Sequence, residues 1–396
     1  EDIPVTYTAT PVNGGVSPTY QWYVNNVLVS GVSGPVYTYT PNNNDLVKCV
    51  LTSSLNCVTG NPATSNTIAQ VVTAVSNPNY WFGGISTNWG VAGNWTDNRI
   101  PASGEDVEYA TVANYGSVAV KDLYVDSVRT IGNLINATSR RLVVPAGKSL
   151  TVNNSIFTNN NDSIIFVEST STLPTGTLIF NNPQNQPVHA TVQMYSPATW
   201  DLTRPVNQKY NWQFFGIPLR TLVAVRSLAG AYVRRYIETG TTISNHWIQL
   251  DDESVMSPFY TYELCQKNTK IYTFQGQLVN SNFNSGQLAK TVGAIYPGQH
   301  LLANPYLAGI DIRQIEFGSD MEASVYMYHT GTFGSWSSAA GGKVGESAGQ
   351  YVSVPQNQAG YSTVPRQVPA MGSMLVRIKT TVPSSTANCY VNLNYN

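Results

Sequence analysis

The apolar residues of this chain of 396 residues fall mainly in short runs that alternate with polar residues. Examples are 5–8 (VTYT) and 36–40 (VYTYT), and the runs are bounded by Gly, Pro and Asn. This two-residue period is typical of half-buried strands, and Thr and Tyr suit a pleated surface. Only 310–317 has the pattern of a helical turn or two. The sequence therefore predicts an all-β fold.

Residues 1–75 are predicted to form an immunoglobulin-like sandwich. Its central strand is 20–24, which places Trp22 between the two sheets. About six strands can be counted where a minimal sandwich of this type has about seven, and the missing strand is the first. We therefore expect either that the chain starts inside a longer protein or that a neighbouring chain supplies this strand.

Two further regions follow in the chain. Residues 76–104 form an aromatic linker that contains Trp81, Trp89 and Trp95. Residues 105–205 are predicted to form short strands separated by frequent turns, among them 118–120, 149–152 and 177–180. This spacing predicts a short β-solenoid-like region, in which each repeat buries its apolar face only by stacking on its neighbours.

Residues 206–396 contain a divergent internal repeat. The segment 214–218 (FFGIP) matches 301–305 (LLANP), and 231–236 matches 323–328. A Thr-Gly turn and a tryptophan follow in both copies, and a second match joins 258–264 to 369–375. Each half is too short to stand alone, so we expect a pseudo-symmetric β-sandwich.

The composition points to a location outside the cell. Charged residues make up only 11% of the chain, against about 25% in an ordinary soluble domain. The net charge of −1 gives no basis for binding nucleic acid or anionic lipid. No apolar run approaches the ~18 residues that span a bilayer, and the first residues lack the pattern of a signal peptide. We expect an extracellular or cell-surface protein without membrane insertion, present as a processed form or as a piece.

Several segments resemble the modular surface proteins that Bacteroidota export through the type IX secretion system. The first module is similar to their tandem immunoglobulin-like (PKD-like) repeats, and the matching text is 8–11, 20–25, 51–54 and 57–66. The aromatic segment 80–84 with 94–95 resembles their tryptophan-glycine linker, and 298–306 resembles a recurrent segment that ends in Asn-Pro-Tyr. The resemblance implies a secreted protein and no reaction.

Four cysteines make disulfides plausible in a chain of extracellular composition. Cys49 and Cys57 flank a turn-like segment and could clip a hairpin, which would leave Cys265 and Cys389 to pair at long range. The alternative is that all four are buried free thiols.

One motif is that of an enzyme. Residues 345–349 spell the Gly-x-Ser-x-Gly of a hydrolase nucleophile elbow around Ser347. That chemistry needs a strand, a strained turn and a helix, and the chain shows no such alternation, so a loop is expected. The histidines lack ligand spacing, and the oxygen-rich segments 42–45, 159–162 and 251–253 are interpreted as turns rather than calcium sites. We predict no catalytic residue, no cofactor and no metal ion.

Two kinds of surface site are candidates. Trp81, Trp89 and Trp95 could stack against a glycan, because aromatic faces suit wet interfaces; the favoured alternative is that they bury against neighbouring modules. Ser127 and Ser163 follow an aspartate and precede an apolar residue, which resembles the O-glycan acceptor pattern of Bacteroidota.

The function predicted from these features is that of a non-catalytic surface protein, structural or adhesive, that acts through multivalent contacts. One alternative is a subunit of an extracellular filament assembled by strand addition. A second is a glycan-binding module. The expected partners are other copies or modules of the same protein, and also glycans or host and cell-surface proteins.

Overall fold

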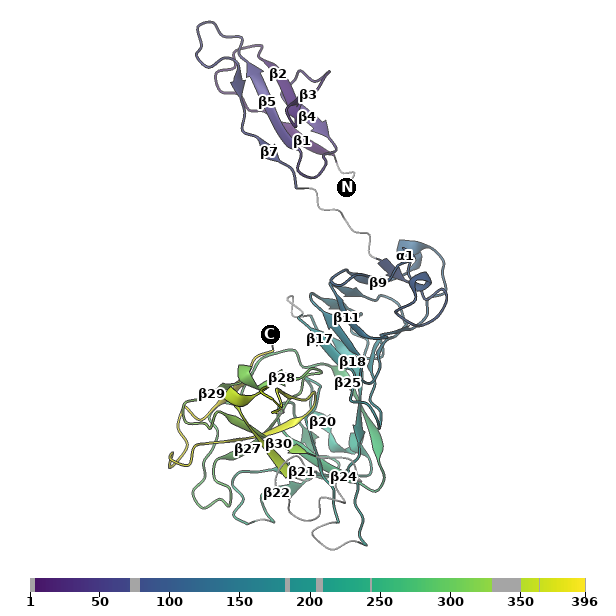
Figure 1. The fold of residues 1–396 in the computed structure, drawn as a ribbon, viewed down its shortest axis with the longest axis vertical. Coiled ribbons are helices and arrows are strands. Elements are labelled where there is room, and N and C mark those ends of the chain that lie inside the picture. Colours follow the sequence, from purple (N-terminus) through teal and green to yellow (C-terminus); the bar gives the residue numbers. More distant parts are fainter. Residues whose placement is uncertain are drawn as a thin grey trace. The chain divides into compact units, whose positions relative to one another are not determined.

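A computed structural model describes residues 4–71, 79–181, 186–203, 209–242, 244–329, 350–362 and 364–395. The chain divides into two compact units, Glu1–Asn77 and Pro78–Asn396 (Figure 1). The fold is all-β, as predicted, with a β-solenoid-like stretch and several sheets.

The first unit has two small antiparallel sheets around an aromatic core. Trp22 is 4% exposed and donates from Nε1 to the carbonyl of Gly34 at 3.0 Å, and the rings of Tyr7 and Tyr37 stack beside it. One sheet pairs β1 (Val5–Thr8) with β4 (Val36–Tyr39). The other is built on β5, with the members β3 (Val27–Leu28), β2 (Thr19–Val24), β5 (Leu46–Thr52), β6 (Ala63–Thr64) and β7 (Ile68–Ala69).

The second unit begins with a parallel β-solenoid. Its successive turns contribute one strand to each of three sheets, so that equivalent strands pair in parallel from turn to turn. The first sheet holds β8 (Asn79–Trp81), β9 (Val107–Tyr109), β12 (Leu134–Ile135) and β15 (Ile156–Phe157). The second holds β10 (Leu123–Tyr124), β13 (Leu142–Val144) and β16 (Ile165–Val167), and the third holds β11 (Val128–Ile131), β14 (Ser149–Val152) and β17 (Thr177–Phe180).

Side-chain alternation explains why these segments form the solenoid. In β14, Leu150 and Val152 are fully buried while Ser149 and Thr151 are only partly buried. Every second side chain of β14 thus enters the shared interior, which no single turn could cover.

Between β9 and β10 the chain forms a single-turn helix, α1 (Val112–Tyr115), which the sequence did not predict. Thr111 Oγ1 accepts from the Asn114 amide at 3.3 Å, and Asn114 Oδ1 accepts from the Thr111 amide at 2.6 Å. This reciprocal capping satisfies amides that a helix end leaves free. The strand expected at 118–120 is absent, because those residues have no strand pairing in the structure.

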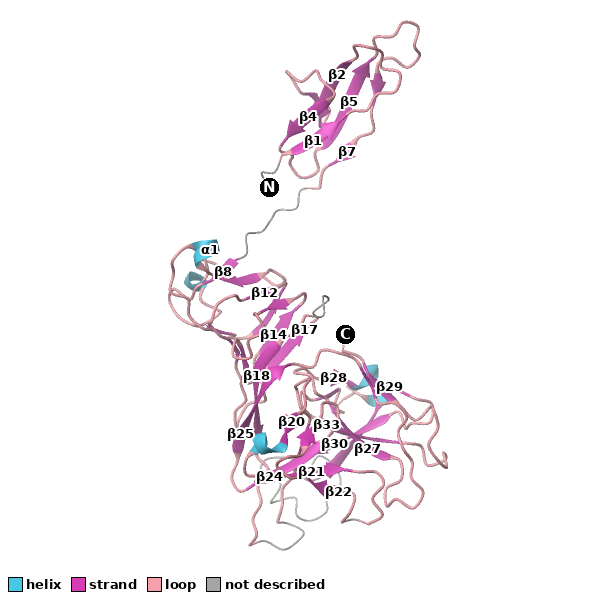
Figure 2. Ribbon diagram, turned by 180° about the vertical axis from the view of Figure 1, so that it is seen from behind, coloured by secondary structure: helices cyan, strands magenta, loops and turns pink. Residues whose placement is uncertain are grey.

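Two long strands join the solenoid to the rest of the second unit (Figure 2). β18 (His189–Ser196) pairs in parallel with β16 and antiparallel with β25 (Lys270–Gln277) along its whole length. The boundary predicted near residue 205 therefore falls between two strands that share a sheet. A single core cluster includes Trp81 in the solenoid, Phe274 in β25 and Leu264 in the segment that precedes β25.

The two halves matched in the sequence have the same strand order. The first half orders its sheet β19 (Gln213–Phe215), β24 (Tyr262–Gln266), β21 (Ala231–Tyr236) and β22 (Trp247–Gln249). The second half orders its sheet β27 (Gln299–Ala303), β33 (Ser373–Arg377), β30 (Ser324–His329) and β31 (Gln350–Pro355).

The smaller elements repeat as well. Each half also has a two-stranded sheet whose first strand leads directly into a 3-10 helix. In the first half these elements are β20 (Val223–Ala224), η3 (Val225–Leu228) and β23 (Val255–Met256). In the second half they are β28 (Ile310–Asp311), η4 (Ile312–Gln314) and β32 (Gln367–Val368). The remaining elements are η1 (Ala92–Asn94), β26 (Phe283–Asn284), β29 (Glu316–Phe317), η5 (Gln356–Gln358) and β34 (Val391–Leu393).

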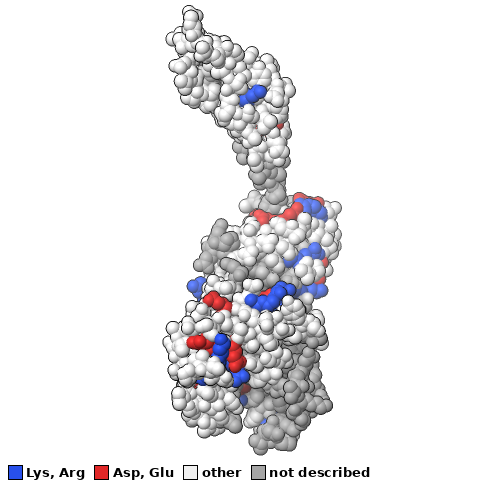
Figure 3. Space-filling view, turned by 60° about the vertical axis from the view of Figure 1, so that its left-hand side comes forward, with Lys and Arg blue, Asp and Glu red and all other residues white. Residues whose placement is uncertain are grey.

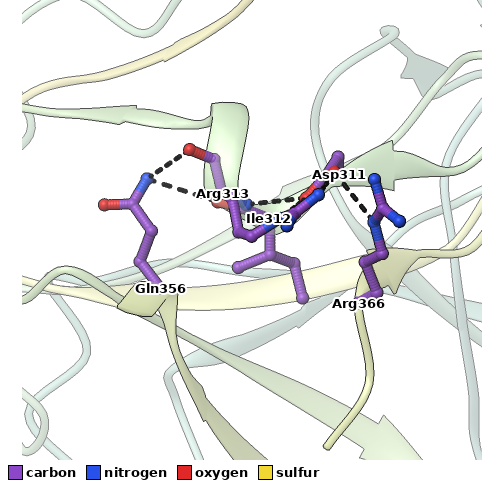
Figure 4. A network of polar contacts seen from close by, with 5 residues as sticks. All are labelled: Asp311, Ile312, Arg313, Gln356 and Arg366. Atoms are coloured by element: carbon purple, nitrogen blue, oxygen red, sulfur yellow. Dashed lines mark hydrogen bonds and ion pairs between the residues drawn. The ribbon is translucent and has the colours of Figure 1, made fainter. Parts of the chain in front are cut away.

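A polar network fixes η4 in the second half (Figure 4). Asp311 caps the amide of Arg313 at 3.0 Å and accepts from the guanidinium groups of Arg313 and Arg366 at 2.7 and 3.0 Å. The hydrogen bonds from Arg313 hold the pKa of Asp311 far below its usual range. Gln356 donates to the carbonyls of Ile312 and Arg313 at 3.3 Å each, so this network holds the fold together rather than forming an open site.

Candidate functional site

The three tryptophans proposed as a glycan platform lie in the core instead. Trp81, Trp89 and Trp95 are 0, 0 and 1% exposed, and Trp95 contacts the other two rings edge-on at 5.0 and 5.1 Å. Trp81 Nε1 donates to the Lys121 carbonyl, and Trp95 Nε1 to that of Trp89. No ring face is left for a sugar, so these residues close the first turn of the solenoid.

Asn94 explains why this part of the chain folds over the rings. Its side chain is fully buried and makes four hydrogen bonds. Oδ1 accepts from the amides of Ile85 and Ser86 at 2.8 and 2.7 Å, while Nδ2 donates to Ser86 Oγ and the Asn88 carbonyl at 2.9 and 2.8 Å. One buried amide thus satisfies the polar groups of a whole turn.

The two serines proposed for O-glycosylation differ in accessibility. Ser163 is exposed, and its hydroxyl accepts a long hydrogen bond of 3.4 Å from Gln275 Nε2. Ser127 is half-buried and donates to Asp126, which is also paired with Arg129 at 2.8 Å. Modification of either serine stays a prediction.

All four cysteines are free in the structure, which contains neither of the two disulfides that the sequence left possible. Cys49, Cys265 and Cys389 are buried, whereas Cys57 is exposed. Burial raises the pKa of the Cys49 thiol, and it raises the pKa of Cys265 to about 12.

The acidic side chains in two of the oxygen-rich turns are engaged by protein donors. Asp45 accepts from the Asn42 amide and Asn25 Nδ2 at 2.8 and 2.7 Å, and the Asn42 amide in particular lowers the pKa of its carboxyl. Asp251 accepts from Ser254 Oγ and its amide at 2.6 and 2.8 Å. Within the described ranges, no group of three or more His, Cys, Asp or Glu side chains is placed to hold a metal ion.

The motif around Ser347 lies outside the described residues. Over the part of the chain that the structure covers, none of the helices has the length and apolar character needed to cross a bilayer. Charged side chains are sparse on the face shown in Figure 3.

The strongest candidate site is a cavity of about 490 Å³ between the sheets of the two halves, which we call the aromatic cavity. Its first wall comes from the face of the β19–β24 sheet that points away from the core. The side chains on this wall are Trp212, Phe214, Arg234, Tyr236, Trp247 and Glu263. The second wall comes from the matching face of the second half, with Gln299, Leu301, Tyr326, Tyr328, Leu375 and Arg377.

Strand register explains this arrangement. Phe214 and Arg234 both lie directly opposite Glu263, so the three form one row across the first sheet. In the second sheet Leu301 and Tyr326 both lie opposite Leu375, which forms the equivalent row. The rings of Phe214 and Tyr328 stack at 4.4 Å and bring the two walls together.

A buried contact between a carboxyl and a guanidinium lies in the first wall. Glu263 Oε1 contacts Arg234 Nη2, and the Glu263 side chain is only 3% exposed. Its burial raises the pKa of Glu263 to about 8, despite the opposing effect of Arg234. The Arg234 guanidinium lies over the Trp212 ring, 3.8 Å from the ring centre. It also lies 5.5 Å from the centre of the Trp247 ring.

The sequence contained a signal for this site that the strand pattern concealed. Glu263 is a lone carboxylate inside the otherwise apolar run 262–265, and Arg234 is a cation in the middle of a strand of the same half. Charges are rarely buried in strands without a partner, so the two residues could have been paired. Which aromatic residues surround them depends on the packing of one half against the other.

A larger groove of about 670 Å³ lies between the solenoid and the sheet of the second half. Its lining combines small polar residues such as Thr170 and Thr175 with large apolar ones such as Met194, and contains no charged side chain among the described residues. It therefore offers less recognition chemistry than the aromatic cavity.

Comparison with known proteins gives one relative. The chain is 36% identical over 333 residues, 80% of its length, to the "Minor fimbrium subunit Mfa5" of Porphyromonas gingivalis, a member of the Bacteroidota. The aligned part covers 26% of that protein, so the chain spans about a quarter of the relative's length. No family model and no solved structure matches the chain. The similarity to a fimbrium subunit indicates an extracellular, cell-surface location.

Proposed function

We propose that this chain is a non-catalytic, structural or adhesive part of a filament on the bacterial surface. The observation that carries the proposal is the similarity to a fimbrium subunit over 80% of the chain. The continuous core of the solenoid and first half suits a stiff element that transmits force along a fibre. A surface with few charges also suits repeated contacts with other copies.

Filaments sheared from cells and purified by density test this proposal. We expect the chain to co-purify with them, and immunogold electron microscopy to place it along the fibre or at its tip. Cells lacking the gene should carry filaments of altered number or length. Recovery of the protein only in the filament-free fraction, with unchanged filaments in the mutant, would contradict the proposal. A hydrolase activity lost in Ser347→Ala would contradict the non-catalytic part.

Assembly by strand addition is the mechanism we propose for joining the first unit to a neighbour. β1 pairs with β4 on one side, and its other edge has no strand partner among residues 4–71. The Ala9 amide donates to the Pro35 carbonyl at 2.8 Å. Because hydrogen-bonded pairs alternate in an antiparallel ladder, the backbone groups of Thr6 and Thr8 point to the open edge. An added strand would pair there.

A proline on that edge tests the mechanism. Thr6→Pro removes an outward amide without removing a bond to β4, and edge strands tolerate proline on their open side. Thr38→Pro is the matched control, since it changes the opposite residue of the same pair. We expect filament assembly to fail with Thr6→Pro alone, while the thermal unfolding of the first unit stays similar in both. Equal assembly of the two variants would exclude addition at β1.

Export through the type IX secretion system is proposed from the sequence resemblance and from the bacterial phylum of the relative. Cells lacking a component of that system should retain the protein inside. Its normal arrival at the surface of such cells would exclude this route.

A further inference from the structure

The aromatic cavity has the size of a ligand site. Its volume of about 490 Å³ lies within the range of about 300–1,000 Å³ usual for small-molecule sites. Both walls are faces of sheets that have packed their other faces into a core, so the cavity is framed by rigid elements. It is therefore present in the folded protein without rearrangement.

The aromatic rings of this cavity are accessible, in contrast to the buried rings of Trp81, Trp89 and Trp95 in the solenoid. Trp212, Trp247 and Tyr326 are half-buried, and Tyr296 and Tyr351 at the edge of the cavity are 37 and 41% exposed. Partly exposed aromatic rings gathered around one hollow mark binding sites more often than structural cores. These aromatic rings remain partly exposed, although their full burial would stabilise the fold.

Polar groups in the wall lack partners of their own. Arg234 Nε and the Tyr236 hydroxyl are buried without a hydrogen bond to any described residue. Leaving such a group unpaired lowers the stability of the folded chain. The partly buried side chains of Gln299 and Arg377 add an amide and a guanidinium to the same lining.

This combination restricts the ligand. Cationic ligands are disfavoured, because the Arg234 guanidinium already lies over the Trp212 ring and the Arg377 guanidinium lies 5.6 Å from the Tyr326 ring. Purely apolar ligands would leave the polar groups unpaired. A pyranose ring has an apolar face of C–H groups that fits an aromatic wall and a rim of hydroxyls that fits the polar groups.

We propose that the aromatic cavity binds a pyranose residue of a glycan. The site is distinct from the solenoid tryptophans, and the proposal stands independently of the filament function. It would give a surface protein a specific ligand in addition to contacts with its own copies.

The test is a glycan array probed with the full chain, with neutral oligosaccharides such as lactose and mannobiose in one arm and carboxylated ones such as sialyllactose in the other. A glycan that binds is then titrated against the variants by calorimetry. We expect Trp247→Ala to weaken binding about tenfold or more. Tyr296→Ala changes a residue at the rim, whose ring contacts that of His246, and should also weaken binding.

Tyr361→Ala is the control, because Tyr361 is 65% exposed and does not line the cavity. We expect its affinity to stay within about twofold of the unchanged chain. Thermal unfolding establishes that each variant is folded. Binding in either arm that falls with Tyr296→Ala and Trp247→Ala supports the proposal. An array without any binder, or an affinity unchanged in folded Trp247→Ala and Tyr296→Ala, would overturn it.

Discussion

The side chain of Glu263 is only 3% exposed, and this burial makes the stability of the fold depend on pH. Its pKa lies near 4.5 without burial and at about 8 in the folded chain. Between these values the folded state holds a proton that the unfolded state has lost. The free energy of unfolding therefore falls as the pH rises through this window, by up to about 1.4 kcal/mol per pH unit.

Replacing Glu263 by Gln isolates this contribution. Gln cannot ionise and has nearly the shape of the protonated side chain. We expect Glu263→Gln to match the unchanged chain at pH 5 and to exceed it increasingly up to pH 8.5, in urea unfolding followed by tryptophan fluorescence. A stability difference that is constant with pH would show that Glu263 does not titrate in this range.

The cysteines allow a second test at the level of single residues. Iodoacetamide reacts with thiolates, and only Cys57 is exposed. We expect mass spectrometry to find one labelled cysteine in the native chain and four after denaturation without reductant. A disulfide between Cys49 and Cys57 would instead leave the native chain unlabelled and make the denatured count depend on reduction.

At the level of elements, the sequence predicted individual strands well and the pairing of distant strands poorly. The alternation in 149–152 and 177–180 identified strands β14 and β17, because burial of one face imposes a two-residue period. The pairing of β18 with β25 was missed, because the alternation of a strand does not say which distant strand will lie beside it. Trp81 was assigned to a linker because nothing local shows that the following turn folds over it.

Two substitutions in one solenoid sheet test the assignment of inward and outward faces. Leu150 on β14 is fully buried, whereas Ile179 on the adjacent β17 is 39% exposed. We expect Leu150→Ala to lower the free energy of unfolding by about 3 kcal/mol, through lost burial and the cavity left behind. Ile179→Ala should cost less than about 1 kcal/mol. Chemical denaturation measures both, and similar losses would mean that the register is shifted.

At the level of the whole molecule, the internal repeat was visible in the sequence but its consequence was not. The matched segments 214–218 and 301–305 include most of strands β19 and β27, which hold the same place in two sheets of equal order. The aromatic cavity arises only where these sheets face each other. Its residues come from positions far apart in the chain, such as Trp247 and Arg377, and no local pattern connects them.

The division into two units predicts independent unfolding. The first unit has its own core around Trp22, and the core clusters of the second unit share no residue with it. Trp22→Ala removes a ring that is 4% exposed and its hydrogen bond to Gly34. The expected cost of about 3–5 kcal/mol is most of the stability of a domain of this size. In calorimetry of the full chain, we expect the transition of the first unit to disappear and that of the second to stay within about 1 °C.

Trp95→Ala should give the reverse, because its ring lies in the second unit's core. Transitions that shift together in both variants would show that the two units unfold as one.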